Sequence, residues 1–164
     1  MNREILGSLL LLALVALVVL RPWEGNTQAG PPSATAEVVR VVDGDTIEAR
    51  IGGEVEDLRL IGVDTPETVK PGTPVQCFGP QASHFTKGRL EGQRVRLVFG
   101  VERRDIYGRL LAYLYLGGRF FNPILVQRGL ARTLTIPPND RFAGRFRRLE
   151  LGAARAGRGL WGAC

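Results

Sequence analysis

The chain has 164 residues, enough for one folded domain and a short additional segment. Its 22 lysine and arginine residues outnumber its 16 aspartate and glutamate residues, which gives a formal net charge of +6. The single histidine, His84, excludes metal sites built from several histidines and catalytic histidine pairs, so we expect it to be an ordinary surface or packing residue. The two cysteines are isolated and lack the paired spacing of a zinc site.

The N-terminal segment is dominated by the apolar run 5–20, which is flanked by arginines. As a helix this run would span about 24 Å, somewhat less than a hydrocarbon core of about 30 Å, and Trp23 would suit the membrane interface. Residues 1–23 are therefore expected to be either a signal peptide or a transmembrane anchor. The small-residue motif at 34–36 lies unusually far downstream for a signal peptidase site, which favours the anchor.

Residues 24–36 are rich in Pro, Gly, Ser and Thr and predict a flexible linker, so the folded domain is expected at 37–164. The first 36 residues carry two basic and two acidic side chains, and the whole net charge therefore belongs to the domain. Of the 22 basic residues, 20 are arginine, which forms two-point hydrogen bonds with phosphate. This bias is compatible with nucleic acid, although solubility alone also accounts for a basic surface.

Alternating and valine-rich stretches predict β-structure through much of the domain. The turn Asp43-Gly44-Asp45 separates the first two strands, and Asp64-Thr65-Pro66 follows the third. Five strands are expected, at 38–42, 46–51, 58–63, 94–99 and 110–116. Between the third and the fourth strand, a loop with several Pro and Gly residues precedes a helical stretch.

Three helices are predicted, the first at 80–90. Asn122 and Pro123 begin the second, with Asn as the N-cap, and Gly129 ends it. The third has one apolar face, formed by Phe142, Phe146, Leu149 and Ala153. Five strands with helices inserted after the third and the fifth predict a β-rich α+β fold, a five-stranded OB-type barrel with about three helices, preceded by the N-terminal apolar helix.

Individually, the polar clusters of the domain have ordinary structural interpretations, such as a hairpin turn or a solvated strand face. Together they supply hard oxygen ligands and a spare carboxylate from Asp45, Asp64 and Glu67, and forked cations from Arg59 and Arg109. Hydrolysis of a phosphodiester needs such groups, because a cation and arginines neutralise the phosphate oxygens while a base activates water. Arg59 lies between Leu58 and Leu60, so it is expected to point away from the leucines.

From Glu37 to Trp161 the chain resembles the staphylococcal nuclease (thermonuclease) family. Five ordered motifs carry the resemblance, and the second, with Arg five residues before Asp-Thr-Pro-Glu, is the most specific. They are Val42-Asp43-Gly44-Asp45-Thr46, Arg59-Leu60-Ile61-Gly62-Val63-Asp64-Thr65-Pro66-Glu67, Phe78-Gly79-Pro80-Gln81-Ala82-Ser83, Asp105-Ile106-Tyr107-Gly108-Arg109-Leu110-Leu111-Ala112-Tyr113, and Leu125-Val126-Gln127-Arg128-Gly129-Leu130-Ala131.

The resemblance implies an OB barrel and a role for each residue of the site. Asp45 and Asp64 would bind Ca²⁺ through their carboxylates, and Thr65 would bind it through its backbone carbonyl. Glu67 would be the general base that acts on water. The remaining residues would bind the substrate: Arg59 and Arg109 the scissile phosphate, and Tyr107 a terminal phosphate or sugar of the bound nucleotide.

Two departures from the family pattern concern substrate affinity and stability. The segment 133–138 contains no tyrosine, whereas the family often has tyrosines there that stack on a base; such stacking contributes about 1–3 kcal/mol per base. Cys77 precedes the third motif, and Cys164 ends the chain, whereas the best-known family member has no cysteine. A disulfide between Cys77 and Cys164 is expected if the domain lies outside the cytoplasm.

Three functions from different classes are considered. The first is a monomeric, calcium-dependent nuclease that acts on DNA and RNA outside the cytoplasm of a bacterium, secreted or held at the membrane. The second is a non-catalytic OB-fold module that binds single-stranded nucleic acid. Such a module would not need the complete set of charged residues, which are Asp45, Asp64, Glu67, Arg59 and Arg109. The third is a membrane-tethered structural or adhesion module whose basic residues in 141–158 contact anionic lipids.

Overall fold

The computed structural model describes residues 30–164, and residues 31–164 form a single compact unit. The predicted anchor at 1–23 and the first part of the predicted linker lie outside the described residues. Within the described part, no helix is long and apolar enough to cross a membrane.

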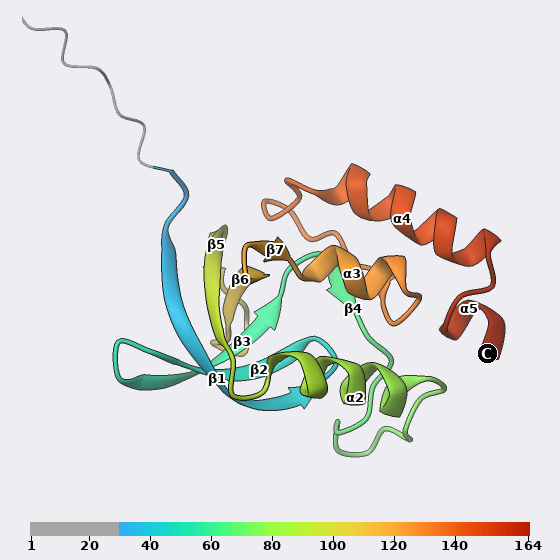
Figure 1. Cartoon of the computed structure of the whole chain (residues 1–164), viewed down its shortest axis with the longest axis horizontal. Coiled ribbons are helices and arrows are strands. Elements are labelled where there is room, and N and C mark those ends of the chain that lie inside the picture. Colours follow the sequence, from blue (N-terminus) through green and yellow to red (C-terminus); the bar gives the residue numbers. More distant parts are fainter. Residues whose placement is uncertain (1–29) are drawn as a thin grey trace, which may run out of the picture. The chain divides into compact units, whose positions relative to one another are not determined.

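In residues 30–164, eight strands form two sheets (Figure 1). The larger sheet has the order β3-β2-β1-β5-β6-β7, and a parallel pairing of β3 with β6 closes its five longest strands into a barrel. The smaller sheet pairs β4 with β8. The strands are β1 Ser33–Asp43, β2 Thr46–Ile51, β3 Glu54–Leu60, β4 Val63–Asp64, β5 Arg94–Arg104, β6 Leu110–Leu116, β7 Arg119–Phe120 and β8 Arg132–Thr133.

The described part of the chain has four helices: α2 Gly79–Leu90, α3 Asn122–Gln127, α4 Ala143–Arg155 and α5 Leu160–Ala163. Helix α2 packs on β1, and α4 packs on α3, as Figure 1 shows. The predicted OB-type barrel and its three main helices are thus confirmed, and the additional α5 is a single short turn.

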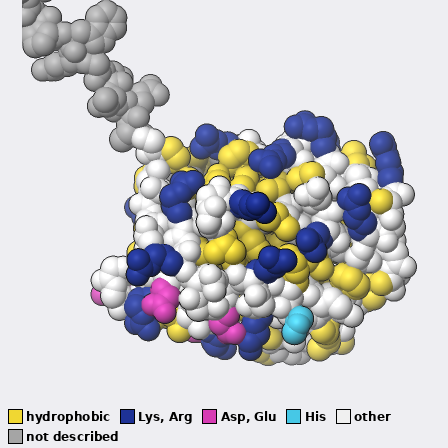
Figure 2. Space-filling view, viewed as in Figure 1, with side chains coloured by type: hydrophobic (Ala, Val, Ile, Leu, Met, Phe, Trp, Pro, Cys, Tyr) yellow, Lys and Arg dark blue, Asp and Glu magenta, His cyan; other side chains and the backbone are white. Residues whose placement is uncertain are grey.

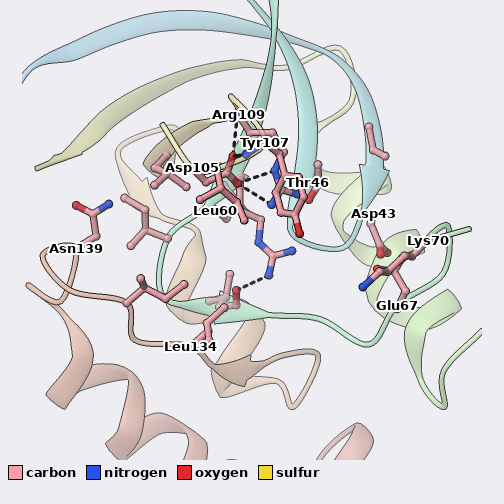
Figure 3. A pocket seen from close by; sticks show the side chains of 18 of the residues that line it. Asp43, Thr46, Leu60, Glu67, Lys70, Asp105, Tyr107, Arg109, Leu134 and Asn139 are labelled. Atoms are coloured by element: carbon pink, nitrogen blue, oxygen red, sulfur yellow. Dashed lines mark hydrogen bonds and ion pairs between the residues drawn. The ribbon is translucent and has the colours of Figure 1, made fainter. Parts of the chain in front are cut away.

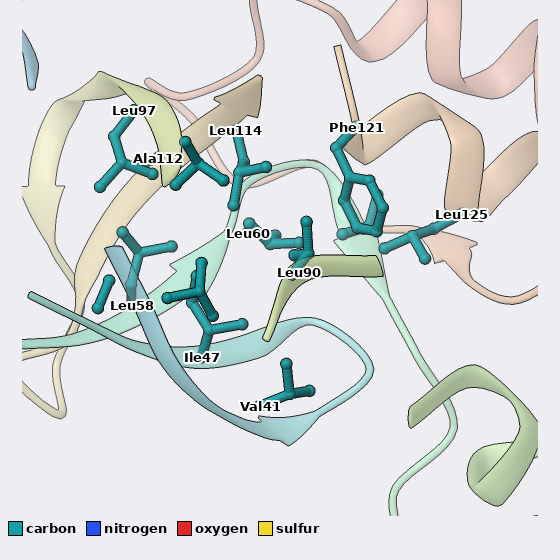
Figure 4. Close-up of a cluster of buried hydrophobic side chains, with 14 of the residues drawn as sticks. Val41, Ile47, Leu58, Leu60, Leu90, Leu97, Ala112, Leu114, Phe121 and Leu125 are labelled. Atoms are coloured by element: carbon teal, nitrogen blue, oxygen red, sulfur yellow. The ribbon is translucent and has the colours of Figure 1, made fainter. Parts of the chain in front are cut away.

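The main core fills the interior of the barrel (Figure 4). Alternate residues of β2, β3, β5 and β6 point inward because successive side chains of a strand face opposite sides. Ile47, Leu58, Leu97 and Leu114 are fully buried there. Leu90 at the end of α2 belongs to the same cluster. The alternating pattern of the strands determines which of their side chains fill the barrel.

Three predicted boundaries need correction. Strand β1 begins at Ser33, because residues 33–37 pair with β5 and Ala36 is buried; the last part of the predicted linker therefore belongs to the domain. The predicted strand 58–63 breaks before β4, at Gly62, whose φ of 83° is left-handed. A Cβ at Gly62 would also overlap the Phe146 ring, so this turn requires glycine.

Asn122 does not cap α3 as predicted, since the N-cap position is Phe121 and has no side-chain cap. The Asn122 side chain is instead fully buried and joins two segments of the barrel. Its Oδ1 accepts a hydrogen bond from the Leu114 backbone at 2.9 Å, and its Nδ2 donates one to the Ile61 carbonyl at 2.9 Å. A buried amide with both ends satisfied holds β6 against the turn that leads to the candidate site.

Cys77 and Cys164 form the predicted disulfide, with their Cα atoms 6.0 Å apart. This bond connects the loop between β4 and α2 to the residue after α5. The loop also contains Glu67, so the cross-link ties one wall of the candidate site to the C-terminal end of the chain.

Candidate active site

The predicted site residues meet at one side of the barrel, where the β1–β2 turn, the end of β3 and the β5–β6 hairpin lie close together. A cavity of about 680 Å³ opens there, and its lining includes Arg59, Glu67, Tyr107 and Arg109. In Figure 3, Glu67 lies on one side of this cavity with Asp43, and Tyr107 and Arg109 lie on the other. Residues separated by fifty positions are thus brought to a shared space.

Asp45 is buried beneath the cavity with only 1% of its surface exposed. Its Oδ2 accepts a hydrogen bond from the Thr65 backbone N–H at 2.7 Å, and its Oδ1 accepts one from Arg59. Desolvation raises the pKa of Asp45, while Arg59 and Thr65 act in the opposite direction. The close fit depends on Gly44, because a Cβ there would lie 2.7 Å from the Thr65 side chain.

Arg59 joins the two predicted metal-binding carboxylates. One terminal nitrogen donates to Asp45, and the other donates to Asp64 Oδ1 at 2.7 Å. Arg59 extends from β3 to the face opposite the buried Leu58 and Leu60, as the strand pattern predicts. The guanidinium therefore offsets part of the negative charge of the two carboxylates that it joins.

These residues also bear on cation binding. Asp45, Asp64 and Thr65 lie within one hydrogen-bonded group, and the Thr65 hydroxyl oxygen is buried without a hydrogen-bond partner. Among the described residues there is no cluster of three or more His, Cys, Asp or Glu side chains suited to a metal. The predicted calcium ligands include only two such side chains, Asp45 and Asp64, together with the backbone carbonyl of Thr65. Its oxygen-only chemistry nevertheless fits a hard cation.

Glu67 is oriented by the backbone that follows it. Its Oε1 accepts hydrogen bonds from the N–H groups of Thr68, Val69 and Lys70, each at 2.9 Å. Burial raises the pKa of Glu67, but these N–H groups and a hydrogen bond with the Asp43 side chain outweigh that effect and lower it. Gln76 adds a hydrogen bond to the Glu67 backbone N–H at 3.0 Å. The carboxylate is thus ionised at neutral pH and fixed in position.

Asp43 is a site residue that the sequence analysis assigned only to a turn. It is buried, lines the cavity beside Glu67, and accepts a hydrogen bond from the Thr68 hydroxyl at 2.8 Å. Thr68 N–H lies within hydrogen-bonding distance of both carboxylates, 2.9 Å from Glu67 and 3.3 Å from Asp43. Burial raises the pKa of Asp43, opposite to the shift of Glu67. Its presence in a conspicuous Asp-Gly-Asp motif was the only indication in the sequence.

Arg109 is positioned by Asp105, a second residue without a predicted role. Asp105 Oδ2 accepts a hydrogen bond from Arg109 Nε at 2.8 Å and forms an ion pair with Nη2 at 2.7 Å. Asp105 Oδ1 accepts the backbone N–H groups of Tyr107 and Arg109, each at 3.0 Å. Burial raises the pKa of Asp105, but the bonds from Arg109 outweigh this and lower it. One carboxylate therefore shapes the hairpin and holds the guanidinium.

Tyr107 is 75% exposed, and its ring lies beside the Arg109 guanidinium, with Cζ 5.2 Å from the ring centroid. The opposite rim contains Leu134 and Ile136, which line the cavity in the segment where tyrosines are absent. The cavity therefore has one aromatic rim at Tyr107 and one aliphatic rim at 134–136.

The family model described as staphylococcal nuclease homologue matches residues 57–163. The thermonuclease of Staphylococcus hyicus is 41% identical over 160 residues, covering 92% of this chain and 95% of that protein. The thermonuclease of Staphylococcus intermedius is 46% identical over 146 residues, covering 85% and 87%. Endonuclease YncB of Bacillus subtilis (strain 168) is 39% identical over 124 residues, covering 74% of this chain and 59% of that protein.

These similarities extend over the barrel, the cavity and the helices that support it. They agree with the five motifs and with the closed barrel, and they confirm the predicted family and the predicted enzyme class, a hydrolase of the nuclease type. The chain belongs to the staphylococcal nuclease family.

Proposed function

We propose that the protein is a calcium-dependent nuclease that hydrolyses DNA and RNA phosphodiesters with little sequence specificity. The observation that carries this proposal is the convergence of Arg59, Arg109 and Glu67 on one cavity, next to the two carboxylates that Arg59 joins. Two guanidinium groups suit a phosphodiester, because the N–H donors that their carboxylate partners leave free can bind phosphate oxygens. The names of the thermonuclease and endonuclease relatives support the reaction class.

In this proposal the arginines stabilise charge on the phosphate. Arg109 keeps its donors directed by the two-point contact with Asp105, so little orientational freedom is lost when a phosphate binds. Arg59 is already held between two carboxylates and lies 19% exposed at the cavity wall. Such preorganised donors stabilise the additional negative charge of the transition state more than that of the bound substrate.

Glu67 acts as the general base in this proposal. Three backbone N–H groups hold one of its oxygens, which leaves the other oxygen to accept a proton from the attacking water. The lowered pKa of Glu67 keeps it deprotonated before the reaction. Tyr107 is exposed at the rim beside Arg109, where it contacts the sugar or terminal phosphate of the bound strand.

Asp45, Asp64 and the Thr65 carbonyl would hold Ca²⁺. The buried Thr65 hydroxyl without a partner and the two converging carboxylates support an oxygen-rich cation site here. When bound, the ion supplies positive charge that polarises the phosphate. Asp45 contributes a desolvated negative charge, and Asp64 contributes a more exposed one.

We further propose that the domain functions as a monomer outside the cytoplasm, held at the membrane by residues 1–23. The disulfide supports an oxidising compartment, and the apolar run 5–20 supports a membrane anchor. Fractionation of host cells and N-terminal sequencing test this. A mature chain that begins at Glu37 would contradict the retained anchor, as would a protein that remains in the cytoplasmic fraction.

The reaction is tested by incubating the purified protein with plasmid DNA and with RNA, in calcium or in chelator. We expect cleavage of both with calcium, none with chelator, and recovery when calcium is restored. A protein that binds single strands but never cleaves them would instead be a non-catalytic binding module.

A further inference from the structure

A row of aromatic rings and guanidinium groups lies on the outer face of β5, β6 and β7, next to the start of α4. We call it the aromatic–arginine row; its members are Arg96, Tyr115, Phe120, Phe142, Arg141 and Arg145. In the upper part of Figure 2, basic side chains lie among hydrophobic ones. The same region of Figure 1 contains β5, β7 and the start of α4.

The strand register builds the first half of the row. Arg96 of β5 pairs with Tyr115 of β6, and Tyr115 pairs with Phe120 of β7, so three neighbouring strands place these side chains side by side. The neighbouring Leu97 and Leu114 are fully buried in the barrel. The alternation of the strands therefore directs the row to the outside, where its rings are partly exposed.

The groups of the row lie in contact with one another. The Tyr115 and Phe120 rings are 4.9 Å apart and nearly parallel, and Arg96 Cζ lies 4.2 Å from the Tyr115 centroid. Phe142 continues the row at 4.9 Å from Phe120, and Arg145 lies 5.5 Å from the Phe120 centroid. A guanidinium stacked on a ring keeps its N–H edge directed outward, available to an anion.

The arginines of the row are free of carboxylate partners. Within residues 30–164, Arg96, Arg141 and Arg145 form no ion pair, whereas Arg40 of β1 and Arg104 at the far end of β5 each pair with a glutamate. Residues 139–149 contain four arginines and one acidic residue, Asp140. The row therefore presents uncompensated positive charge.

The apolar cluster that supports the row also forms part of the wall of the catalytic cavity. Ile61 and Leu111 line the cavity and belong to the same apolar cluster as Tyr115, Phe120 and Phe142. Tyr113 belongs to the same cluster. Its ring is 4.9 Å from Phe142, and its hydroxyl donates a hydrogen bond at 3.3 Å to the carbonyl of Asn139, another cavity-lining residue.

We propose that the aromatic–arginine row binds the single-stranded segment of the nucleic acid that extends from the scissile phosphate. This inference rests on the proposed function, since it places that phosphate in the cavity. Partly exposed rings suit stacking with bases of any sequence, and unpaired arginines suit the phosphates between them. It also provides stacking surface in a chain whose segment 133–138 has no tyrosine. An anionic membrane would attract the same arginines, but the shared apolar cluster places the row beside the cavity, which favours a strand.

The test measures binding in chelator, where no cleavage occurs, by fluorescence anisotropy of a labelled oligothymidylate dodecanucleotide and trinucleotide. The row variant carries Arg96→Gln, Arg141→Gln and Arg145→Gln. The matched control carries Arg50→Gln, Arg155→Gln and Arg158→Gln, which removes the same charge elsewhere. We expect the row variant to bind the dodecanucleotide about tenfold or more weakly, with a salt-dependence slope lower by about 2, because each phosphate contact contributes about 0.7 for single strands.

The trinucleotide fills the cavity without reaching the row, so its affinity should be the same for the parent, the row variant and the control. Phe120→Leu should weaken the dodecanucleotide by about tenfold through lost stacking, with its melting temperature checked separately. Equal dodecanucleotide affinity and slope in the row variant and the control would overturn the proposal. So would a row variant that loses binding only to phosphatidylglycerol vesicles.

Cleavage with calcium of a nitrophenyl phosphodiester of thymidine separates this inference from the proposed function. A row variant that keeps the parental rate on this small substrate while losing long-strand binding supports both. If the parent never cleaves but the row variant loses binding to long strands, the proposed role of the row is supported and the proposed nuclease activity is contradicted. Parental rates on both small and long substrates contradict the row alone.

Discussion

Replacing Glu67 with Gln removes the proposed base while keeping the size of the side chain. The carboxylate accepts three backbone N–H groups at 2.9 Å, and an amide oxygen can accept the same three. The loop should therefore keep its conformation. The loss of charge weakens these bonds, at a cost of at most about 1–2 kcal/mol because the group is partly screened by solvent. Loss of a general base usually lowers the rate about 10²–10⁴-fold, which corresponds to roughly 3–5 kcal/mol in the activation barrier.

The assay is the initial rate of single-stranded DNA cleavage at saturating calcium and saturating substrate, together with the thermal melting of both proteins. We expect a rate lower by the factor above and a melting temperature close to that of the parent. Asp43→Asn serves as the comparison, because it removes the neighbouring buried carboxylate but leaves the proposed base in place. If Glu67→Gln cleaves DNA at the parental rate, the assignment of the base is wrong.

Asp45→Asn should weaken the cation site, so raising calcium should partly restore its activity, as a calcium titration would show; a defect independent of calcium would refute this role. Arg109→Lys should lower the rate severely, because a point charge replaces a fork, and rescue at high substrate would contradict a transition-state role. Arg109 depresses the pKa of Asp105 in the folded state. The difference in unfolding free energy between the parent and Asp105→Asn should therefore be complete above about pH 4 and disappear as the pH falls through that lower pKa. Urea unfolding at several pH values tests this sign. Replacing Cys77 and Cys164 with Ala should lower the free energy of unfolding by about 4–5 kcal/mol, the chain-entropy limit for a separation of 87 residues. We expect a lower melting temperature. An unchanged melting temperature would show that the bond is not formed.

Local patterns in the sequence were sufficient to predict most of the fold. The period-two alternation of β2, the apolar face of α4 and the Asp-Gly-Asp turn each depend on residues close together in the chain. The motif from Arg59 to Glu67 also indicated the family, because its residue types and spacing are specific. The five strands and three main helices were therefore predictable, apart from their boundaries.

The tertiary structure decided which side chains act together. Arg59 joins Asp45 to Asp64, Asp105 directs Arg109, and Asp43 lies beside Glu67, although Asp43 and Glu67 are 24 positions apart.

Asn122 has a local pattern typical of a helix cap, yet in the fold it binds Leu114 and Ile61. Burial explains this difference: a buried amide must satisfy its hydrogen bonds with the groups that the fold places around it, whereas a local pattern describes only its neighbours in the chain. Barrel closure by β3 and β6 likewise depends on the pairing of Leu58 with Leu110, which no short stretch of sequence contains. The sequence by itself thus determined the elements and the chemical groups, and the packing of distant segments determined the partners of each group.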